Sequence, residues 1–158
     1  MVIVIIVVLI AVGIGLYFGL SLRKSNKEDL ENGTLIKRDG DFYNQAELFT
    51  LRPVTGEEFN LAAKEIGFPI PVSGKTSNMI FTGSNYQASL QMIEKTDTYC
   101  VYRFMIDKWK GRYGLPDSFD LTSMNKLMTS VEKIMLKLDP NTKVKTEEIE
   151  RKTSPSFF

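Results

Sequence analysis

The chain has 158 residues, which is enough for one folded domain and an additional segment. Its 20 Lys and Arg residues nearly balance its 19 Asp and Glu residues, so no global charge would recruit nucleic acid or an anionic membrane. The chain contains no histidine, which excludes Ser-His and Cys-His nucleophile pairs and removes the commonest ligand of protein metal sites.

The first part of the chain is strongly apolar. Residues 2–20 read VIVIIVVLIAVGIGLYFGL and carry no charge. As a helix, this run would span about 28 Å, close to the hydrocarbon core of a bilayer. A lone strand could not satisfy its backbone hydrogen bonds in lipid. We therefore expect residues 2–22 to form a single transmembrane helix. A cleaved signal peptide is the alternative, but the run exceeds the usual ~7–15 apolar residues and no small-residue cleavage site follows it.

Flanking charges indicate the orientation of this helix. Arg23, Lys24 and Lys27 follow the apolar run directly. Because positively charged flanks stay on the cytoplasmic side, we expect the remainder of the chain to lie in the cytoplasm, attached to the cell membrane. The single cysteine, Cys100, agrees with a reducing compartment, since it has no partner for an internal disulfide.

Small residues recur along one side of the predicted transmembrane helix. Ala11, Gly15 and Gly19 are spaced four residues apart. Such a stripe lets two helix backbones approach closely, so it favours self-association or packing on the helix of a partner protein. The alternative is a helix that only anchors the chain, because glycine is common in membrane spans.

Residues 23–40 are polar and read as a juxtamembrane linker, and the folded domain is expected over residues 41–140. A strand is predicted over 42–51. Next comes the capping box that Thr55 and Glu58 form at the start of a helix ending at Gly67.

From residue 78 to 108 apolar and polar residues alternate, which predicts an antiparallel meander of three strands. A helical stripe of apolar residues then predicts a long second helix over 119–138. The charged residues 141–158 are expected to be a flexible tail, because Ser-Pro-Ser near the end favours disorder, and a short edge strand or helix is the alternative. The order β-α-β-β-β-α predicts an α+β fold of two layers, with an antiparallel sheet packed on one long helix.

The triplet Gly74-Lys75-Thr76 resembles the end of a phosphate-binding loop. The first glycine of that motif would fall at Pro69, which has no N–H to donate, and Pro71 removes a second donor. The triplet also precedes a strand instead of a helix. We therefore expect a connection between the first helix and the meander, with Lys75 exposed to solvent.

Cations alternate with aromatic residues in the loop at 107–113. Its candidate ligand-binding residues are Lys108, Trp109, Lys110, Arg112 and Tyr113. The cations could hold phosphate groups while an aromatic ring stacks on a base or lies at a lipid headgroup. The alternative is a solvated strand end, where Trp109 covers the core and the lysine stems lie over it.

No set of residues predicts catalysis. Cys100 falls in the middle of a predicted strand, where a thiol is usually buried and inert. We therefore expect neither an enzyme nor a bound cofactor or metal. The sequence favours a membrane-anchored protein-interaction or accessory module, and binding of anionic lipid or nucleic acid through the 107–113 loop is the alternative. A nucleic-acid partner is disfavoured by the near-neutral charge.

Overall fold

The computed structural model describes residues 27–31, 35–111 and 114–149. The expected transmembrane helix at 2–22, with Ala11, Gly15 and Gly19, lies outside these residues. Within the described ranges, no helix combines the length and the apolar character that crossing a membrane requires. The chain divides into two compact units, Met1–Lys37 and Arg38–Phe158.

The described part of the first unit is small. Residues 27–31 are helical, and the Lys27 ammonium lies 3.8 Å from the Glu31 carboxylate one turn later. The Leu35 N–H donates to the carbonyl of Asp29 at 2.9 Å, so the chain folds back after this short helix. These residues belong to the segment that the sequence marks as a juxtamembrane linker.

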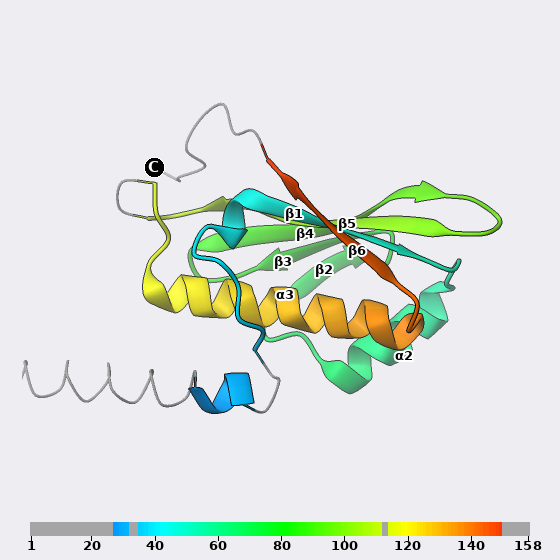
Figure 1. The fold of residues 1–158 in the computed structure, drawn as a ribbon, viewed down its shortest axis with the longest axis horizontal. Coiled ribbons are helices and arrows are strands. Elements are labelled where there is room, and N and C mark those ends of the chain that lie inside the picture. The colour runs from blue at the N-terminus through cyan, green and yellow to red at the C-terminus, as the bar shows by residue number, and fades with distance from the viewer. Residues whose placement is uncertain (1–26, 32–34, 112–113, 150–158) are drawn as a thin grey trace, which may run out of the picture. The chain divides into compact units, whose positions relative to one another are not determined.

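The second unit is an α+β fold, as predicted, in which two helices accompany a six-stranded antiparallel sheet (Figure 1). The strands lie in the order β2-β3-β4-β5-β1-β6. The elements are η1 (Phe42–Asn44), β1 (Gln45–Leu51), α2 (Gly56–Ile66), β2 (Val72–Lys75), β3 (Asn78–Thr82), β4 (Tyr86–Lys95), β5 (Cys100–Trp109), α3 (Ser118–Leu138) and β6 (Lys143–Glu148).

Both helices begin at residues that satisfy their first backbone N–H groups. At α2, Thr55 Oγ1 accepts from the Glu58 N–H at 3.2 Å and the Glu58 carboxylate accepts from the Thr55 N–H at 2.8 Å, which confirms the predicted capping box. Gly67 ends α2 with a φ of 75°. At α3 the cap is Asp117, whose carboxylate accepts from the Asp120 N–H at 2.8 Å.

The core lies between the helices and one face of the sheet. The central strand β5 contributes Tyr102, Phe104 and Ile106, which are essentially inaccessible to solvent. The stripe of α3 predicted from the sequence covers them, and α2 adds Phe59 beside Tyr102, with ring centroids 5.9 Å apart. Figure 1 shows α2 and α3 along the same side of the sheet. The sheet therefore has one covered face and one face without a helix in the described part of the domain.

The sheet has one strand that the sequence offered only as an alternative, β6, and one that it did not predict, β2. Strand β6 pairs antiparallel with β1 over residues 143–148, so the flexible tail expected from residue 141 instead begins with an ordered edge strand. All of its residues except Glu147 are exposed, and an exposed charged edge strand carries no hydrophobic alternation for the sequence to reveal. The folded unit was expected to begin at residue 41, but it already includes Arg38, whose guanidinium donates hydrogen bonds to side chains of α3.

Strand β2, which the sequence did not predict, contains Gly74 and Lys75. It forms a hairpin with β3 in which Lys75 is paired with Asn78. Gly74 has a φ of 97°, and a Cβ there would lie 2.2 Å from the carbonyl oxygen of Asn78. Lys75 is exposed, as predicted. The glycine of the triplet is therefore used for a close backbone approach within a hairpin.

Candidate functional site

The first candidate site is the sheet face that points away from α2 and α3, which we name the outer face. Because directly opposed residues of an antiparallel pair share one face, the strand registers define its members. They are Ser73 and Lys75 on β2, Asn78, Ile80 and Thr82 on β3, Gln87, Ser89 and Gln91 on β4, Val101, Arg103 and Met105 on β5, Ala46, Leu48 and Thr50 on β1, and Lys143, Lys145 and Glu147 on β6.

Apolar side chains of β1 and β5 lie together in the middle of the outer face, namely Ala46, Leu48, Val101 and Met105. Ile80 lies apart from them on β3, because polar Ser89 of β4 stands between Ile80 and Met105 in the register. Leu48 and Met105 are half-buried although no described helix covers them, and Ile80 is half-buried as well. None of the three belongs to the core cluster on the other face. Lys143, Lys145 and Glu147 form the border on β6. An apolar centre inside a polar rim is the usual composition of a protein–protein interface.

Arg103 lies among these apolar residues. Its register partners are Leu48 on β1 and Gln91 on β4. Its Nε is buried without a hydrogen-bond partner among the described residues. A buried donor without an acceptor costs free energy until a partner supplies one. Arginine is also enriched among the residues that dominate binding energies at interfaces.

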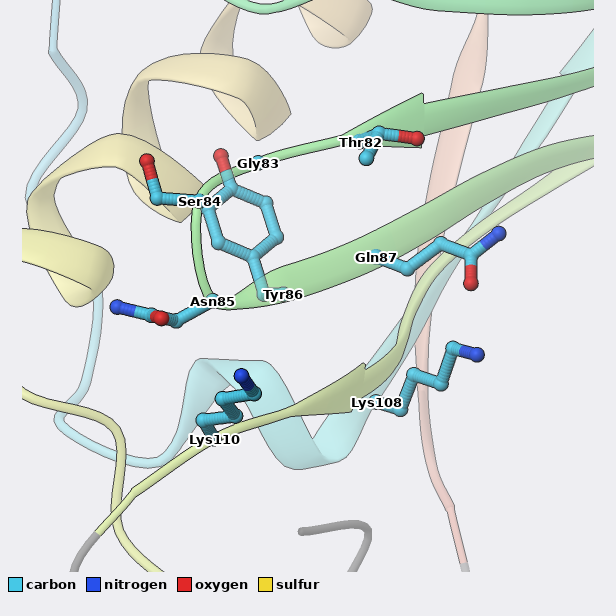
Figure 2. Close-up of a pocket in the computed structure, with 8 residues that line it drawn as sticks. All are labelled: Thr82, Gly83, Ser84, Asn85, Tyr86, Gln87, Lys108 and Lys110. Atoms are coloured by element: carbon cyan, nitrogen blue, oxygen red, sulfur yellow. The ribbon is translucent and has the colours of Figure 1, made fainter. Parts of the chain in front are cut away.

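A second candidate site lies at the end of the sheet, where the β3–β4 turn meets the end of β5. This end pocket has a volume of about 310 Å³ (Figure 2). Most residues around it carry polar groups, although much of the surface they present is apolar; they are Thr82, Gly83, Ser84, Asn85, Tyr86, Gln87, Lys108 and Lys110. In Figure 2 the side chains of Gln87 and Lys108 extend in the same direction, and Tyr86 points toward α3. Two lysines and several hydroxyl and amide groups suit an anionic ligand group.

Hydrogen bonds to α3 hold the turn of the end pocket in place. Asn85 Nδ2 donates to the Asp120 carboxylate at 3.1 Å, and the Tyr86 hydroxyl lies 2.8 Å from Ser123 Oγ. The Asn85 carbonyl accepts from the Lys110 N–H at 2.6 Å, which ties the turn to the end of β5. Burial raises the pKa of Tyr86 above its usual value, so this hydroxyl stays protonated and serves in positioning.

The structure separates the residues predicted at 107–113. Lys108 and Lys110 line the end pocket, whereas Trp109 is only 2% exposed. Its Nε1–H donates to the Gly114 carbonyl at 2.9 Å and its ring packs edge-on against Tyr43. Trp109 therefore covers the core, as in the alternative reading, and has no open ring face for a base. Arg112 and Tyr113 lie outside the described residues.

A third site is a buried ion cluster of Arg38, Glu47 and Glu132, which no local sequence pattern predicts. Arg38 precedes η1, Glu47 lies on β1 and Glu132 on α3, and all three side chains are largely buried. The Arg38 guanidinium donates to Glu132 and lies 3.7 Å from Glu47. It also donates to Thr129 Oγ1 at 2.9 Å and to Asn125. The cluster fastens the start of the folded unit to α3.

The pKa of Glu47 is raised to about 8, chiefly by burial and then by the neighbouring Glu132 carboxylate, and Arg38 lowers it by less. One guanidinium cannot neutralise two buried carboxylates, so Glu47 keeps a proton and hydrogen-bonds with Glu132. Oε2 of Glu47 has no hydrogen-bond partner among the described residues. The three segments are far apart in sequence, and only the α-β packing brings them together.

Cys100 lies where the sequence placed it, in a strand and fully buried. Its thiol donates to the Arg52 carbonyl at 3.3 Å. Burial raises the pKa of this thiol, which disfavours the reactive thiolate.

Comparison with family models and with curated proteins found no match. Among solved structures, the chain is similar to the "NMR structure of PA4090 from Pseudomonas aeruginosa", with a TM-score of 0.38 and 10% sequence identity. The similarity covers 67% of this chain and 98% of that chain.

Proposed function

We propose that this protein is a single-pass membrane protein whose α+β domain binds another protein through the outer face, without catalysing a reaction. The observation that supports this function is the apolar centre of the outer face on β1 and β5, where Leu48 and Met105 lie beside the polar residues of β4 and β6. An antiparallel sheet with one face in water normally alternates apolar and polar residues cleanly. Binding of a partner removes these apolar side chains from water, which favours the complex.

The Arg103 Nε has no hydrogen-bond partner among the described residues, so a protein that binds this surface should supply an acceptor for it. A partner that offers a carbonyl or carboxylate oxygen between Leu48 and Gln91 would satisfy it. Such a bond would form in a desolvated setting, where hydrogen bonds to charged groups are worth about 1.5–3 kcal/mol. The proposed partner surface is therefore largely apolar, with at least one hydrogen-bond acceptor near its centre.

The proposed setting is the cytoplasmic side of the cell membrane, because Arg23, Lys24 and Lys27 follow the apolar run at 2–22. The small residues Ala11, Gly15 and Gly19 would let the anchor pack on the membrane helix of the same partner or of a second copy. Two contacts on one tether bind more tightly than either alone, because the second contact forms at high effective concentration.

Charged substitutions on the outer face test this function. Leu48→Asp and Met105→Asp introduce a carboxylate into the apolar centre and are expected to abolish recovery of the partner after mild detergent solubilisation. Leu61→Asp is the matched control, since Leu61 is 62% exposed on α2. Equal recovery of the same partner with all three variants would refute outer-face binding.

The end pocket favours a second candidate function, binding of an anionic lipid headgroup or a nucleic-acid phosphate. Its specific support is that Lys108 and Lys110 both line one hollow with Thr82, Ser84 and Gln87. The buried Trp109 cannot supply the aromatic contact expected at 107–113, and Tyr113 lies outside the described residues. The described residues of the pocket would recognise the anion through charge and hydrogen bonds. Substitution of the two lysines tests it, as described below.

A further inference from the structure

Strand β6 is an open edge of the sheet among the residues that the structure describes. It is the last strand in the order β2-β3-β4-β5-β1-β6, and its other side pairs with β1. Five of its six residues are exposed and Val144 is 47% exposed. An edge strand presents unpaired backbone N–H and C=O groups that can pair with a further strand.

The backbone groups at this edge can be assigned to particular residues. The Ile149 N–H donates to the Asn44 carbonyl at 3.0 Å, which continues the β1–β6 register by one residue. Because hydrogen-bonded and non-hydrogen-bonded pairs alternate along an antiparallel ladder, Lys143, Lys145 and Glu147 also point their backbone groups toward β1. The backbone groups that face the open edge are therefore those of Val144, Thr146 and Glu148.

Charge is divided between the two halves of β6. Lys143 and Lys145 lie in its first half and Glu147 and Glu148 in its second. In an antiparallel pair of two such strands, the basic half of each faces the acidic half of the other. Edge strands also carry charges to prevent pairing with another strand. Such protection works when like charges would face each other in the pair. On β6 the pairing brings opposite charges together, so its charges favour pairing.

We propose that β6 pairs with β6 of a second copy of this chain, in an antiparallel register centred on Thr146. This register joins the two sheets around a two-fold axis. It aligns Val144 of each copy with Glu148 of the other, so the open backbone groups assigned above become hydrogen-bonded. The proposed dimer uses the border of the outer face on β6 and leaves its apolar centre on β1 and β5 available, so it is independent of the function proposed for that centre.

The charges select this register over its neighbour. Centring on Thr146 places Lys145 of each copy opposite Glu147 of the other, in a non-hydrogen-bonded pair whose Cα atoms lie about 4.5 Å apart. Lys145 and Glu147 already lie 3.5 Å apart within one copy, on the same face of the strand. Centring on Lys145 would instead bring the two Lys145 side chains together.

The opposite edge of the sheet lacks these features. Strand β2 has four residues, follows Pro71 and contains Gly74 in a left-handed conformation. Its one charged residue is Lys75, so two β2 strands would not bring opposite charges together. A short edge strand of this kind is a poor template for pairing. Strand β2 therefore supplies a matched control.

Disulfide trapping of the full chain in phosphatidylcholine vesicles tests the proposal. Thr146→Cys places a thiol on the two-fold axis, with an expected Cα separation of about 5.5 Å, within the range of disulfides. Ser73→Cys places an exposed thiol on β2. Mild oxidation is expected to trap the Thr146→Cys dimer and not the Ser73→Cys dimer. Equal trapping of the two would overturn the proposal, because the membrane anchor alone would then explain the encounters.

Charge reversal gives the decisive comparison. In the Thr146→Cys background, Lys145→Glu or Glu147→Lys alone is expected to reduce trapping by roughly tenfold, because both symmetry-related pairs become repulsive. Mixing differently tagged copies of these two variants is expected to restore trapping as a heterodimer, since both cross-strand pairs are then of opposite sign. This recovery would also show that each variant is folded. Trapping that is insensitive to these charges, or no recovery in the mixture, would overturn the proposed register.

Discussion

The carboxylate of Glu47 lies 3.7 Å from the guanidinium of Arg38, which is also bonded to Glu132. Two carboxylates therefore share one buried cation, and the pKa of Glu47 rises to about 8 from an ordinary value of 4.5. Below pH 4.5 the Glu47 side chain is protonated in both the folded and the unfolded chain. Above pH 4.5 the unfolded chain loses this proton while the folded chain keeps it up to about pH 8.

Glu47→Gln is therefore expected to change how stability depends on pH. Glu47 should lower the free energy of unfolding of the wild type as the pH rises from 4.5 to 8. Its contribution is up to about 1 kcal/mol per pH unit. Glutamine has the same shape and no charge to lose, so the variant should lack this slope and be the more stable protein at pH 8. Denaturant unfolding at several pH values measures the difference, with the exposed Glu57→Gln as control. Parallel pH profiles for Glu47→Gln and wild type would contradict the assignment.

Arg38→Ala removes the only cation of the buried ion cluster among the described residues. It is expected to destabilise the domain by about 3–5 kcal/mol, because the Glu132 charge loses its buried partner. The neighbouring exposed Lys37→Ala should change stability by less than about 0.5 kcal/mol. Adding Glu132→Gln to Arg38→Ala should recover part of the loss in thermal unfolding. A mild effect of Arg38→Ala would mean that the cluster does not fasten the start of the fold.

Gly74→Ala is expected to destabilise the β2–β3 hairpin by about 1–3 kcal/mol, because φ is 97° and the new Cβ would lie 2.2 Å from the Asn78 carbonyl oxygen. Gly40→Ala is the matched control, since a Cβ there has no atom within 4 Å. Hydrogen exchange of the β3 amides would locate the effect. Comparable stability of the two variants would rule out a required close approach at Gly74.

The sequence predicted the elements whose pattern is local and missed those that depend on the assembled fold. The capping box at Thr55 and the apolar stripe of α3 are short-range signals, and both elements formed within one or two residues of expectation. Strand β6 was only the alternative to a flexible tail, because most of its side chains are exposed and no alternation of apolar and polar residues distinguishes it from a charged tail. The candidate sites follow the same rule. Lys108 and Lys110 were found as neighbours in sequence, whereas the Arg38 cluster joins three distant segments.

The end pocket gives a prediction for anion binding. Lys108→Ala with Lys110→Ala is expected to remove binding of a single-stranded oligonucleotide, or of vesicles containing phosphatidylserine, to the full chain in neutral nanodiscs. Lys64→Ala with Lys133→Ala removes the same charge from exposed positions on α2 and α3 and should leave binding unchanged. Wild-type binding should weaken as salt rises. Retained binding by the Lys108 and Lys110 variant would exclude the pocket.

Site-specific photo-cross-linking in native membranes tests the proposed function most directly. A photoreactive side chain at Met105 lies in the apolar centre of the outer face, and one at Leu61 lies on the exposed side of α2. The account predicts one adduct of defined mass from the Met105 position, absent from the Leu61 position and lost when Leu48→Asp is added. No adduct from Met105, or the same adducts from both positions, would contradict binding of a protein partner through the outer face.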